Sequence, residues 1–467
     1  MISGALRELF GLIVEFFSKE EVWWMVLLLA VVGGLGAFSI PGIEIWPIIL
    51  EILRFLVLTW WLWAFFLLLP LTKNAVKHWR QEVFKSKLSW ILLELKIPRE
   101  ILKSPKAMEQ VLQVFQSLRA APGKFSEEVL EGQIVPPFSL EIASVNGALH
   151  LYVRCQKKHQ QVVEASMFSY YPDVEVREAD DYLPLVPNSD AEMIARDWNF
   201  WGTEMVLTRE AVYPIKTYDE FEHAAEEKQF DPISVLIEML GKIRGGVVAI
   251  HFLIAPADPK WGGKWASFVE NLRKPAVVET GEGEDKRSST IPRSHRQGAV
   301  LEAIDEHLSK PAFDTLIRCL YAAPVASFDD AAAKSGILSA FNQYTASDLN
   351  GFKPNSAVAV KASSTSWPYV QARRRTSYRR QRFLWNFHRR EVPPETGWGR
   401  LLHSSLLNPG FKSTRFLMTS KSLATLFHPP TAVVLTAPHI ERVESRKAGP
   451  PAGLAIFGEE GEIERYV

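Results

Sequence analysis

The chain has 467 residues, more than the core of one domain usually holds, and this length predicts two or three domains. Its 53 lysine and arginine residues equal its 53 aspartate and glutamate residues. The balance excludes the overall basic character of many nucleic-acid-binding proteins, so any basic surface must be local. Hydrophobic residues make up 47% of the chain and are concentrated in the first 72 positions.

Two apolar runs occupy those first positions. Residues 22–40 contain no charged side chain, and neither do residues 55–71. At about 1.5 Å per residue in a helix, runs of this kind are long enough to cross the hydrocarbon core of a bilayer. Tryptophans in both runs could serve as interfacial anchors. The pattern predicts a hairpin of two transmembrane helices over residues 22–72.

The charges beside these runs predict an orientation. The linker at 41–47 carries one charge, Glu44, whereas five basic residues follow the second run: Lys73, Lys77, Arg80, Lys85 and Lys87. By the positive-inside rule, the larger C-terminal part and the N-terminus then lie in the cytoplasm. Residues 1–21 have apolar side chains at helical spacing and predict an amphipathic helix on the inner surface. The expected location is the bacterial inner (cytoplasmic) membrane, as a multi-pass protein with both termini cytoplasmic.

Residues 88–183 have the pattern of one α/β domain. A strand is predicted at 90–97, followed by a helix that begins near Pro105 and has an apolar stripe from Met108 to Leu118. Further elements in this domain are predicted as strands at 138–143, 149–155 and 174–178 and a helix at 160–171. The order βαββαβ is that of a ferredoxin-like unit.

Residues 200–425 predict a second unit of the same kind. Asp231 and Pro232 open a helix with the same apolar spacing. Strands are expected at 205–208, 247–255, 315–322 and 414–419 and a helix at 329–344. The polar residues 280–295 predict a disordered loop, and 426–467 a C-terminal extension. The predicted fold class is therefore a membrane-anchored α+β protein in which two transmembrane helices precede two ferredoxin-like (βαββαβ) units.

No pattern of residues predicts catalysis. The GxxxxGK[ST], HExxH and GxSxG motifs are missing, and the eleven histidines are scattered without ligand spacing. Cys155 and Cys319 stand in apolar runs, outside any CxxC motif, and predict buried thiols in a reducing compartment. We therefore expect no catalytic residue, no cofactor, no metal site and no enzymatic activity.

Residues 373–400 are the exception to the even charge distribution. They contain nine arginines and only two acidic residues, with tyrosine, phenylalanine and tryptophan interleaved. The pattern fits three interpretations: a DNA-binding surface, a face that docks an acidic partner or inner-leaflet lipid, and a solvated helix. The candidate nucleic-acid or partner-binding residues are Arg373, Arg374, Arg375, Arg379, Arg380, Arg382, Arg389 and Arg390.

Several short motifs, in this order, resemble a known family. They are WILLELKIPRE with SPKAMEQVLQVFQSL, FSLEIAS, YYPDVEVREADDY, DPISVLIEMLGKI with HFLIAPADPKW, AFNQYTASDLNGFKP, SYRRQRFLWNFHRRE, and SLATLFHPP with PHIERVESRKAGPP. Over residues 88–452 the chain resembles the membrane-proximal, non-ATPase region of the type IV secretion and conjugative DNA-transfer coupling proteins, which are associated with HerA/FtsK-like ATPases.

The resemblance implies a role in DNA transfer. In that family a nucleotide-binding loop would be expected soon after a segment like 448–458, but none occurs before Val467. We therefore expect a non-enzymatic inner-membrane component that anchors and assembles a separately encoded HerA/FtsK-like P-loop ATPase and forms a homo-oligomer. The alternatives are a membrane-tethered nucleic-acid-binding module that uses segment 373–400 and a membrane scaffold unrelated to DNA transfer.

Overall fold

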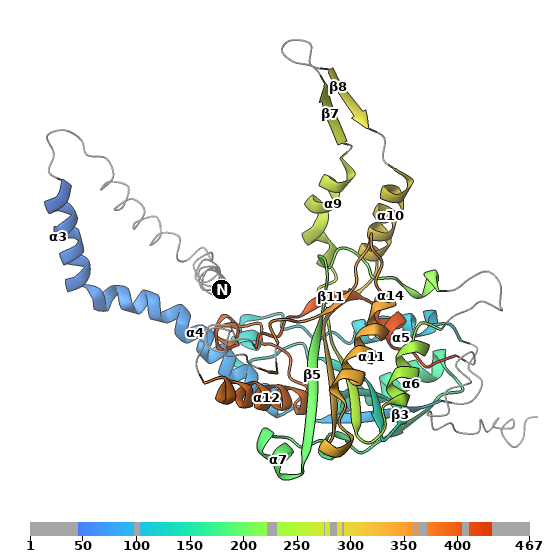
Figure 1. Ribbon diagram of the computed structural model, residues 1–467. Coiled ribbons are helices and arrows are strands. Elements are labelled where there is room, and N and C mark those ends of the chain that lie inside the picture. The colour runs from blue at the N-terminus through green and yellow to red at the C-terminus, as the bar shows by residue number, and fades with distance from the viewer. Residues whose placement is uncertain are drawn as a thin grey trace, which may run out of the picture.

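The computed structural model describes residues 45–97, 103–221, 231–274, 276–280, 287–291, 294–358, 360–361, 371–403 and 411–431. Figure 1 shows a body built on one large sheet, from which two extensions project. One extension is the helical arm formed by α3 (Ile45–Leu58) and the first part of α4 (Trp60–Ser86). The other is a tower formed by α9 (Ala266–Arg273), β7 (Ala276–Thr280), β8 (Arg287–Ile291) and α10 (His295–Ser309).

Nine strands form the sheet of the body, and all their described pairings are antiparallel. Their order is β10-β5-β9-β6-β2-β3-β1-β4, with β11 paired to β9. The strands are β1 (Trp90–Lys96), β2 (Phe138–Val145), β3 (Ala148–Gln156), β4 (Glu175–Glu178), β5 (Trp198–Leu207), β6 (Val247–Pro256), β9 (Ala312–Pro324), β10 (Phe352–Pro354) and β11 (Phe416–Thr419).

The main apolar core lies between the sheet and a layer of helices. This layer consists of α5 (Lys106–Ser117), α6 (Gln160–Tyr170), α8 (Ser234–Lys242), α11 (Asp330–Asn342) and α14 (Ser420–Leu426). Met108, Val111 and Phe115 illustrate how the layer forms, because their helical spacing brings all three onto one fully buried face of α5. Phe252 on β6 and Ile317 on β9 belong to the same core.

Helix α12 (Ala372–His388) packs with Phe383, Leu384 and Phe387 on the opposite face of the sheet. A Cβ atom at Gly202 on β5 would come within 2.3 Å of the Phe383 ring, so a residue without a side chain is required at this contact. The shorter helices α7 (Asp190–Ala195) and α13 (Gly397–Leu402) complete the described α-helices.

A row of polar side chains crosses the sheet beneath α12. Each member is the register partner of the next on the neighbouring strand. The row consists of Glu94 on β1, Tyr152 on β3, Glu141 on β2, His251 on β6, Arg318 on β9 and Glu204 on β5. The last four of these side chains are completely buried. Buried charges require partners, so the segment that packs on this row must supply groups that pair with its charges.

Arg318 connects this row to the end of α12. Its Nε and Nη2 atoms donate to Glu204 Oε1 at 3.1 and 2.8 Å. Its Nη1 atom donates to the carbonyl oxygen of Asn386 at 2.8 Å, and Nη2 also donates to that of Glu391 at 3.1 Å. The Ser413 hydroxyl donates to Glu204 Oε1. The buried pair therefore fixes the backbone of residues 386–391 against the sheet.

The predicted two-helix membrane hairpin is wrong, and so is the predicted multi-pass location in the inner membrane. None of the helices in the described part of the chain combines the length and the apolar character that crossing a bilayer requires. The run 55–71 is divided, because α3 ends at Leu58 and α4 begins at Trp60. Helix α3 spans only about 21 Å, and α4 becomes polar from Lys73 onward. The run 22–40 and the predicted amphipathic helix at 1–21 lie outside the described residues.

The predicted fold class of two ferredoxin-like units after a membrane anchor is also wrong. The individual helices and strands occur close to their predicted positions, but the strands of residues 88–183 and 200–425 join in one sheet. The junction is the pairing of β2 with β6, two strands that are buried on both faces. An edge at β2 would leave a row of backbone groups unpaired, and β6 satisfies them.

Two further segments differ from expectation or lie beyond the described chain. Part of the segment predicted as a disordered loop, residues 280–295, forms β8, which pairs with β7 at the tip of the tower. Of the predicted C-terminal extension at 426–467, residues 432–467 lie outside the described residues.

Replacing Arg318 by Met should destabilise the fold strongly, because the substitution leaves the Glu204 carboxylate buried without its cation. We expect a loss of about 3–5 kcal/mol in the free energy of unfolding, measured by urea denaturation. As a control, Arg273→Met breaks an exposed pair with Asp305 and should cost less than about 1 kcal/mol. An Arg318→Met cost as small as that of the control would contradict the structural role of the row.

Candidate functional site

The candidate arginines of segment 373–400 divide into two groups. Arg379 and Arg390 are buried, Arg380 is half-buried, and all three bond to other parts of the fold. Arg373, Arg374 and Arg389 are exposed, and Arg375 and Arg382 are half-buried. The structure therefore does not bring the eight predicted residues together as one basic surface.

Arg390 is buried directly beyond the end of α12. Its Nε and Nη2 atoms donate to the two carboxylate oxygens of Glu141 at 2.6 and 3.0 Å. Nη1 and Nη2 also donate to the carboxylate of Asp181 at 2.7 and 3.0 Å. Burial alone would raise the pKa of Glu141, but the nearby charge of Arg390 holds that pKa well below its usual range. Arg390 thus neutralises the middle of the polar row.

The backbone of Arg390 takes a left-handed conformation, with φ at +51°. The amide N–H of Arg390 donates to the carbonyl oxygen of Phe387, and that of Glu391 donates to Asn386. This is the pattern of a Schellman helix end, in which glycine is the usual left-handed residue. The four bonds of the guanidinium stabilise arginine in the conformation that glycine would adopt more easily.

Arg379 and Arg380 also hold the helix in place. Arg380 Nε donates to Asp190 Oδ1 at 2.5 Å, and its guanidinium lies 4.4 Å from the ring centre of Phe200. Arg379 Nη1 donates to the carbonyl oxygen of Lys361 at 3.2 Å, and burial lowers the pKa of the Arg379 guanidinium. Substituting either residue would disturb the seating of α12 as well as its charge.

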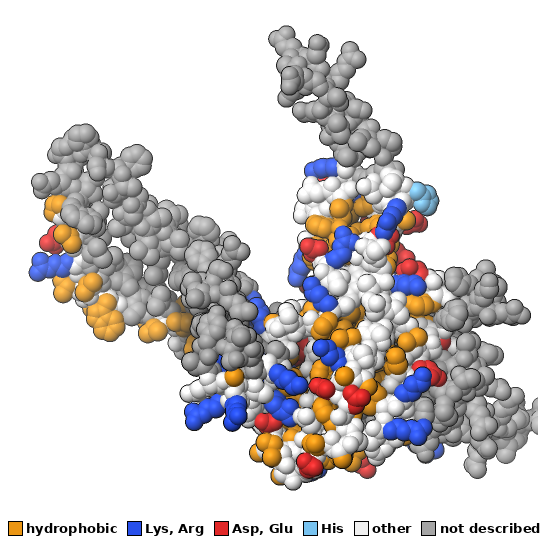
Figure 2. Space-filling view, viewed as in Figure 1, with side chains coloured by type: hydrophobic (Ala, Val, Ile, Leu, Met, Phe, Trp, Pro, Cys, Tyr) orange, Lys and Arg blue, Asp and Glu red, His pale blue; other side chains and the backbone are white. Residues whose placement is uncertain are grey.

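The outer face of α12 carries exposed cations and aromatic rings. Lys and Arg side chains gather over this helix in Figure 2. The side chains of Tyr378 and Trp385 are 50% and 53% exposed. The Arg389 guanidinium lies 4.8 Å from the ring centre of Trp385, within the range of a cation–π contact. Exposed Arg373 and Arg374 lie near the N-terminal end of the same helix.

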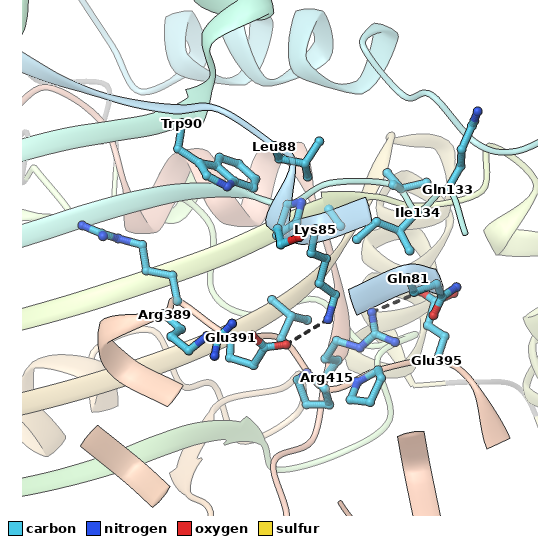
Figure 3. A pocket seen from close by; sticks show the side chains of 18 of the residues that line it. Gln81, Lys85, Leu88, Trp90, Gln133, Ile134, Arg389, Glu391, Glu395 and Arg415 are labelled. Atoms are coloured by element: carbon cyan, nitrogen blue, oxygen red, sulfur yellow. Dashed lines mark hydrogen bonds and ion pairs between the residues drawn. The ribbon is translucent and has the colours of Figure 1, made fainter. Parts of the chain in front are cut away.

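A cleft of about 590 Å³ begins where α12 ends. Most of its wall comes from the C-terminal half of α4, residues 119–137, strands β1 and β3, and residues 388–395. Asp181, Ala255 and Arg415 complete the lining. Figure 3 shows Lys85 of α4 paired with Glu391, while Trp90 and Leu88 stand together at another side of the cleft. The cleft therefore depends on segments that are far apart in the sequence.

The charges that line the cleft do not balance. Its four acidic residues each form an ion pair with a basic lining residue: Lys77–Glu128, Lys85–Glu391, Arg390–Asp181 and Arg415–Glu395. The remaining basic residues, Arg119, Arg154 and Arg389, have no hydrogen bond or ion pair from their side chains to any described residue. Three guanidinium groups of the lining are thus left without a salt bridge, while Glu82, Glu141 and Asp314, outside the lining, pair with the lining cations Lys85, Arg390 and Arg415.

Arg154 is the most constrained of the three. It stands on β3 and lies 4.1 Å from the ring centre of Trp90. Burial, and then the neighbouring charge of Arg390, lower the pKa of Arg154 to about 10. Arg119, just beyond the end of α5, has a buried Nε atom without a hydrogen-bond partner. Glu141 and Asp181 offset part of the charge of Arg154 at longer range, but neither guanidinium has the hydrogen-bonded acidic partner that a buried cation normally finds within the fold.

Nothing described in the cleft forms a metal or thiol site. Among the described residues no group of three His, Cys, Asp or Glu side chains could hold a metal ion. Cys155 and Cys319 are buried free thiols. Burial raises the pKa of Cys155 to about 12, which disfavours its nucleophilic thiolate. Sequence reasoning missed Arg119, Arg154 and Trp90 because they stand singly in ordinary helix and strand patterns, where no local signal marks them.

Buried His251 lies beneath the cleft with Tyr182. The Tyr182 hydroxyl donates to Glu141 Oε2 at 2.8 Å, so the His251 Nε2–H, 2.6 Å away, donates to the Tyr182 oxygen. This assignment gives the neutral ring, with Nδ1 unpartnered and the ring stacked 4.2 Å from that of Phe387. Burial lowers the pKa of His251 to about 3.

Comparison with known proteins gives a family for this α+β architecture. Residues 75–441 match DUF8128, described as a domain of unknown function. The match covers most of the chain, so the protein belongs to the DUF8128 family. The matched segment includes every residue that lines the cleft. No match to a curated protein was found.

Acidification from about pH 7 to about pH 5 should destabilise the fold. The unfolded chain binds a proton at His251 below about pH 6.5, whereas the folded chain does so only near pH 3. His307 behaves likewise, because burial lowers its pKa to about 4. Stability should therefore fall as the pH drops below 6.5, by about 2 kcal/mol for each histidine at pH 5, measured by urea unfolding.

His251→Gln removes one of these titrating groups and should make the decline with pH shallower, even if stability at pH 7 is reduced. His295→Gln at the exposed start of α10 provides a matched control and should leave the slope unchanged. Equal slopes for wild type and His251→Gln would show that His251 is not buried in its neutral form.

Proposed function

We propose that this protein is a non-enzymatic nucleic-acid-binding component of a DNA-transfer assembly, and that the outer face of α12 contacts single-stranded DNA. The observation that carries the proposal is the combination of exposed Arg373, Arg374 and Arg389 with the exposed ring of Trp385 on one helix. Guanidinium groups bind backbone phosphates, and exposed aromatic rings stack on unpaired bases.

The buried arginines support this function indirectly. Arg380 is bound to Asp190 of α7, and Arg390, just beyond the end of α12, is bound to Glu141 of β2. These two ion pairs hold α12 in place. The exposed side chains consequently project from a fixed helix, which lowers the entropy lost when a ligand binds. An acidic protein partner would meet the same cations, but Trp385 and Tyr378 add flat rings suited to bases.

The resemblance to coupling proteins supplies the cellular setting of the proposal. A component of this kind would work with a separately encoded HerA/FtsK-like P-loop ATPase and would assemble as a homo-oligomer. Because the described surface offers charge and aromatic contacts but no metal or thiol site, binding is the role its chemistry favours. The ATPase would supply the energy for movement of DNA.

Single-stranded DNA binding should depend on the outer face of α12. Arg373→Glu with Arg374→Glu should weaken binding roughly tenfold and flatten its salt dependence, because two phosphate contacts are lost. Trp385→Ala should cost about 1–3 kcal/mol of binding free energy, the usual value of one base stack. The measurement is fluorescence anisotropy with a labelled oligonucleotide at several salt concentrations.

Lys157→Glu with Lys158→Glu is the matched control. It makes the same change in charge at two exposed residues at the start of α6, away from α12. This variant should bind nearly as well as wild type. If both double variants lose affinity equally, the interaction is an unspecific charge effect; if wild type does not bind, the DNA proposal fails.

Association with an ATPase can be tested in the native cell. We expect a tagged copy of the chain to retain a P-loop ATPase after chemical cross-linking and purification, identified by mass spectrometry. The retention should survive nuclease treatment, because the proposed contact is between proteins. Recovery of the chain without any P-loop protein would contradict the proposed association with an ATPase.

A further inference from the structure

We propose that the cleft beside α4 binds a phosphate-bearing ligand of nucleotide size, whose phosphate is held by Arg119 and Arg154. This site is separate from the outer face of α12 and does not depend on DNA binding there. Only Arg389 borders both surfaces.

The first argument for the site is that three guanidinium groups in its lining form no salt bridge. All four acidic lining residues are engaged by lining cations, and Arg119, Arg154 and Arg389 remain without an acidic partner among the described residues. Guanidinium groups without a salt bridge in the wall of a cleft keep their N–H donors available to an anion. Guanidinium groups favour phosphate in particular, because their planar donors match two of its oxygens.

The second argument is the free-energy cost of burying these two guanidinium groups without hydrogen-bonded acidic partners. Arg119 has a buried Nε–H without an acceptor, although every donor of this kind normally finds a partner. Burial and the charge of Arg390 disfavour the protonated form of Arg154, which lowers its pKa. A phosphate bound in the cleft that both residues line would accept hydrogen bonds from these guanidinium groups and offset their charge.

The third argument is the shape and lining of the cleft. Its volume of about 590 Å³ falls within the range of small-molecule sites, which is roughly 300–1,000 Å³. The lining also includes apolar side chains, among them Pro393 and three that Figure 3 labels, Trp90, Leu88 and Ile134. The chemistry of the lining therefore suits a ligand with a phosphate at one end and a ring or apolar group at the other.

Lys85 and Glu391 close the cleft on the side of α4. Lys85 Nζ lies 2.9 Å from the Glu391 carboxylate and 2.8 Å from that of Glu82. The coulombic attraction of these carboxylates raises the pKa of Lys85, despite the opposing effect of its burial. Lys85 is thus already neutralised, and of the three unpaired arginines Arg389 stacks on Trp385, so we assign the phosphate to Arg119 and Arg154.

The phosphate could belong to a free nucleotide or to the end of a nucleic-acid strand. Isothermal titration calorimetry on the full chain distinguishes these sources with four probes: pyrophosphate, ATP, a short oligonucleotide with a 5′-phosphate, and the same oligonucleotide with a 5′-hydroxyl. Saturable binding of ATP assigns a free nucleotide. A preference for the 5′-phosphorylated oligonucleotide, without ATP binding, assigns a strand end.

Arg154→Gln and Arg119→Gln should each weaken binding of the responding probe by roughly tenfold or more, the usual effect of losing one charged hydrogen-bonding group. Arg154→Lys, which keeps the charge, should restore part of the affinity. Arg196→Gln provides a control at an exposed arginine paired with Glu192. Circular dichroism and thermal unfolding identify any variant that fails to fold. If Arg154→Gln on strand β3 fails to fold, Arg119→Gln in the segment after α5 decides.

The proposal is overturned if no phosphate probe binds the wild type, or if both glutamine variants bind as well as the Arg196→Gln control. Its failure is distinguishable from failure of the DNA proposal. Variants of Arg373 and Arg374 test the outer face of α12 alone, whereas those of Arg119 and Arg154 leave that face intact.

Discussion

The fold depends on how charges are neutralised beneath α12. Burying a carboxylate or a guanidinium is costly, and the cost is offset only when each charge is paired and hydrogen-bonded. Arg318 meets this condition through Glu204 and two backbone carbonyls, and Arg390 meets it through Glu141 and Asp181. Arg318 bonds to the carbonyls of Asn386 and Glu391, and Arg390 lies between these two residues, so both arginines fix the end of α12 and the residues after it. Electrostatics within the sheet therefore decide where that stretch lies.

The cleft follows from this constraint. Residues 388–395 form one of its walls, and they begin at the left-handed turn of Arg390. The turn directs the Arg390 side chain into the sheet and leaves Arg389 exposed beside Trp385. Because Arg390 is buried near Arg154, its charge also disfavours the protonated state of Arg154. One internal ion pair thus shapes both the wall of the cleft and the chemistry of its unpaired arginine.

The sequence predicted local structure well and architecture poorly. Periodicity located α5 and β6 because an apolar stripe or run is a property of neighbouring residues. The polar row could not be predicted from local sequence patterns, since Glu141 and Arg390 are 249 positions apart and neither belongs to a recognisable motif. The run 55–71 favoured a membrane span by hydropathy, which does not register the break between α3 and α4. The arginines of 373–400 were recognised. Their spacing could not show that Arg390 would be buried against Glu141 of the sheet, or that Arg379 and Arg380 would bond to Lys361 and Asp190.

Arginines of α12 therefore have two roles: some fix the helix within the fold and others are exposed to solvent. This difference affects how mutations of these arginines must be interpreted. A charge reversal at Arg379 or Arg380 would remove a cation and also loosen α12, so a loss of binding would not locate the binding surface. Reversal at exposed Arg373 or Arg374 changes charge without removing a buried contact described in the fold. A helix fixed by its inner arginines can present its outer ones in a constant geometry. If the inner pairs were weakened, we would expect affinity to fall through lost preorganisation, with the salt dependence of binding largely unchanged because the phosphate contacts remain.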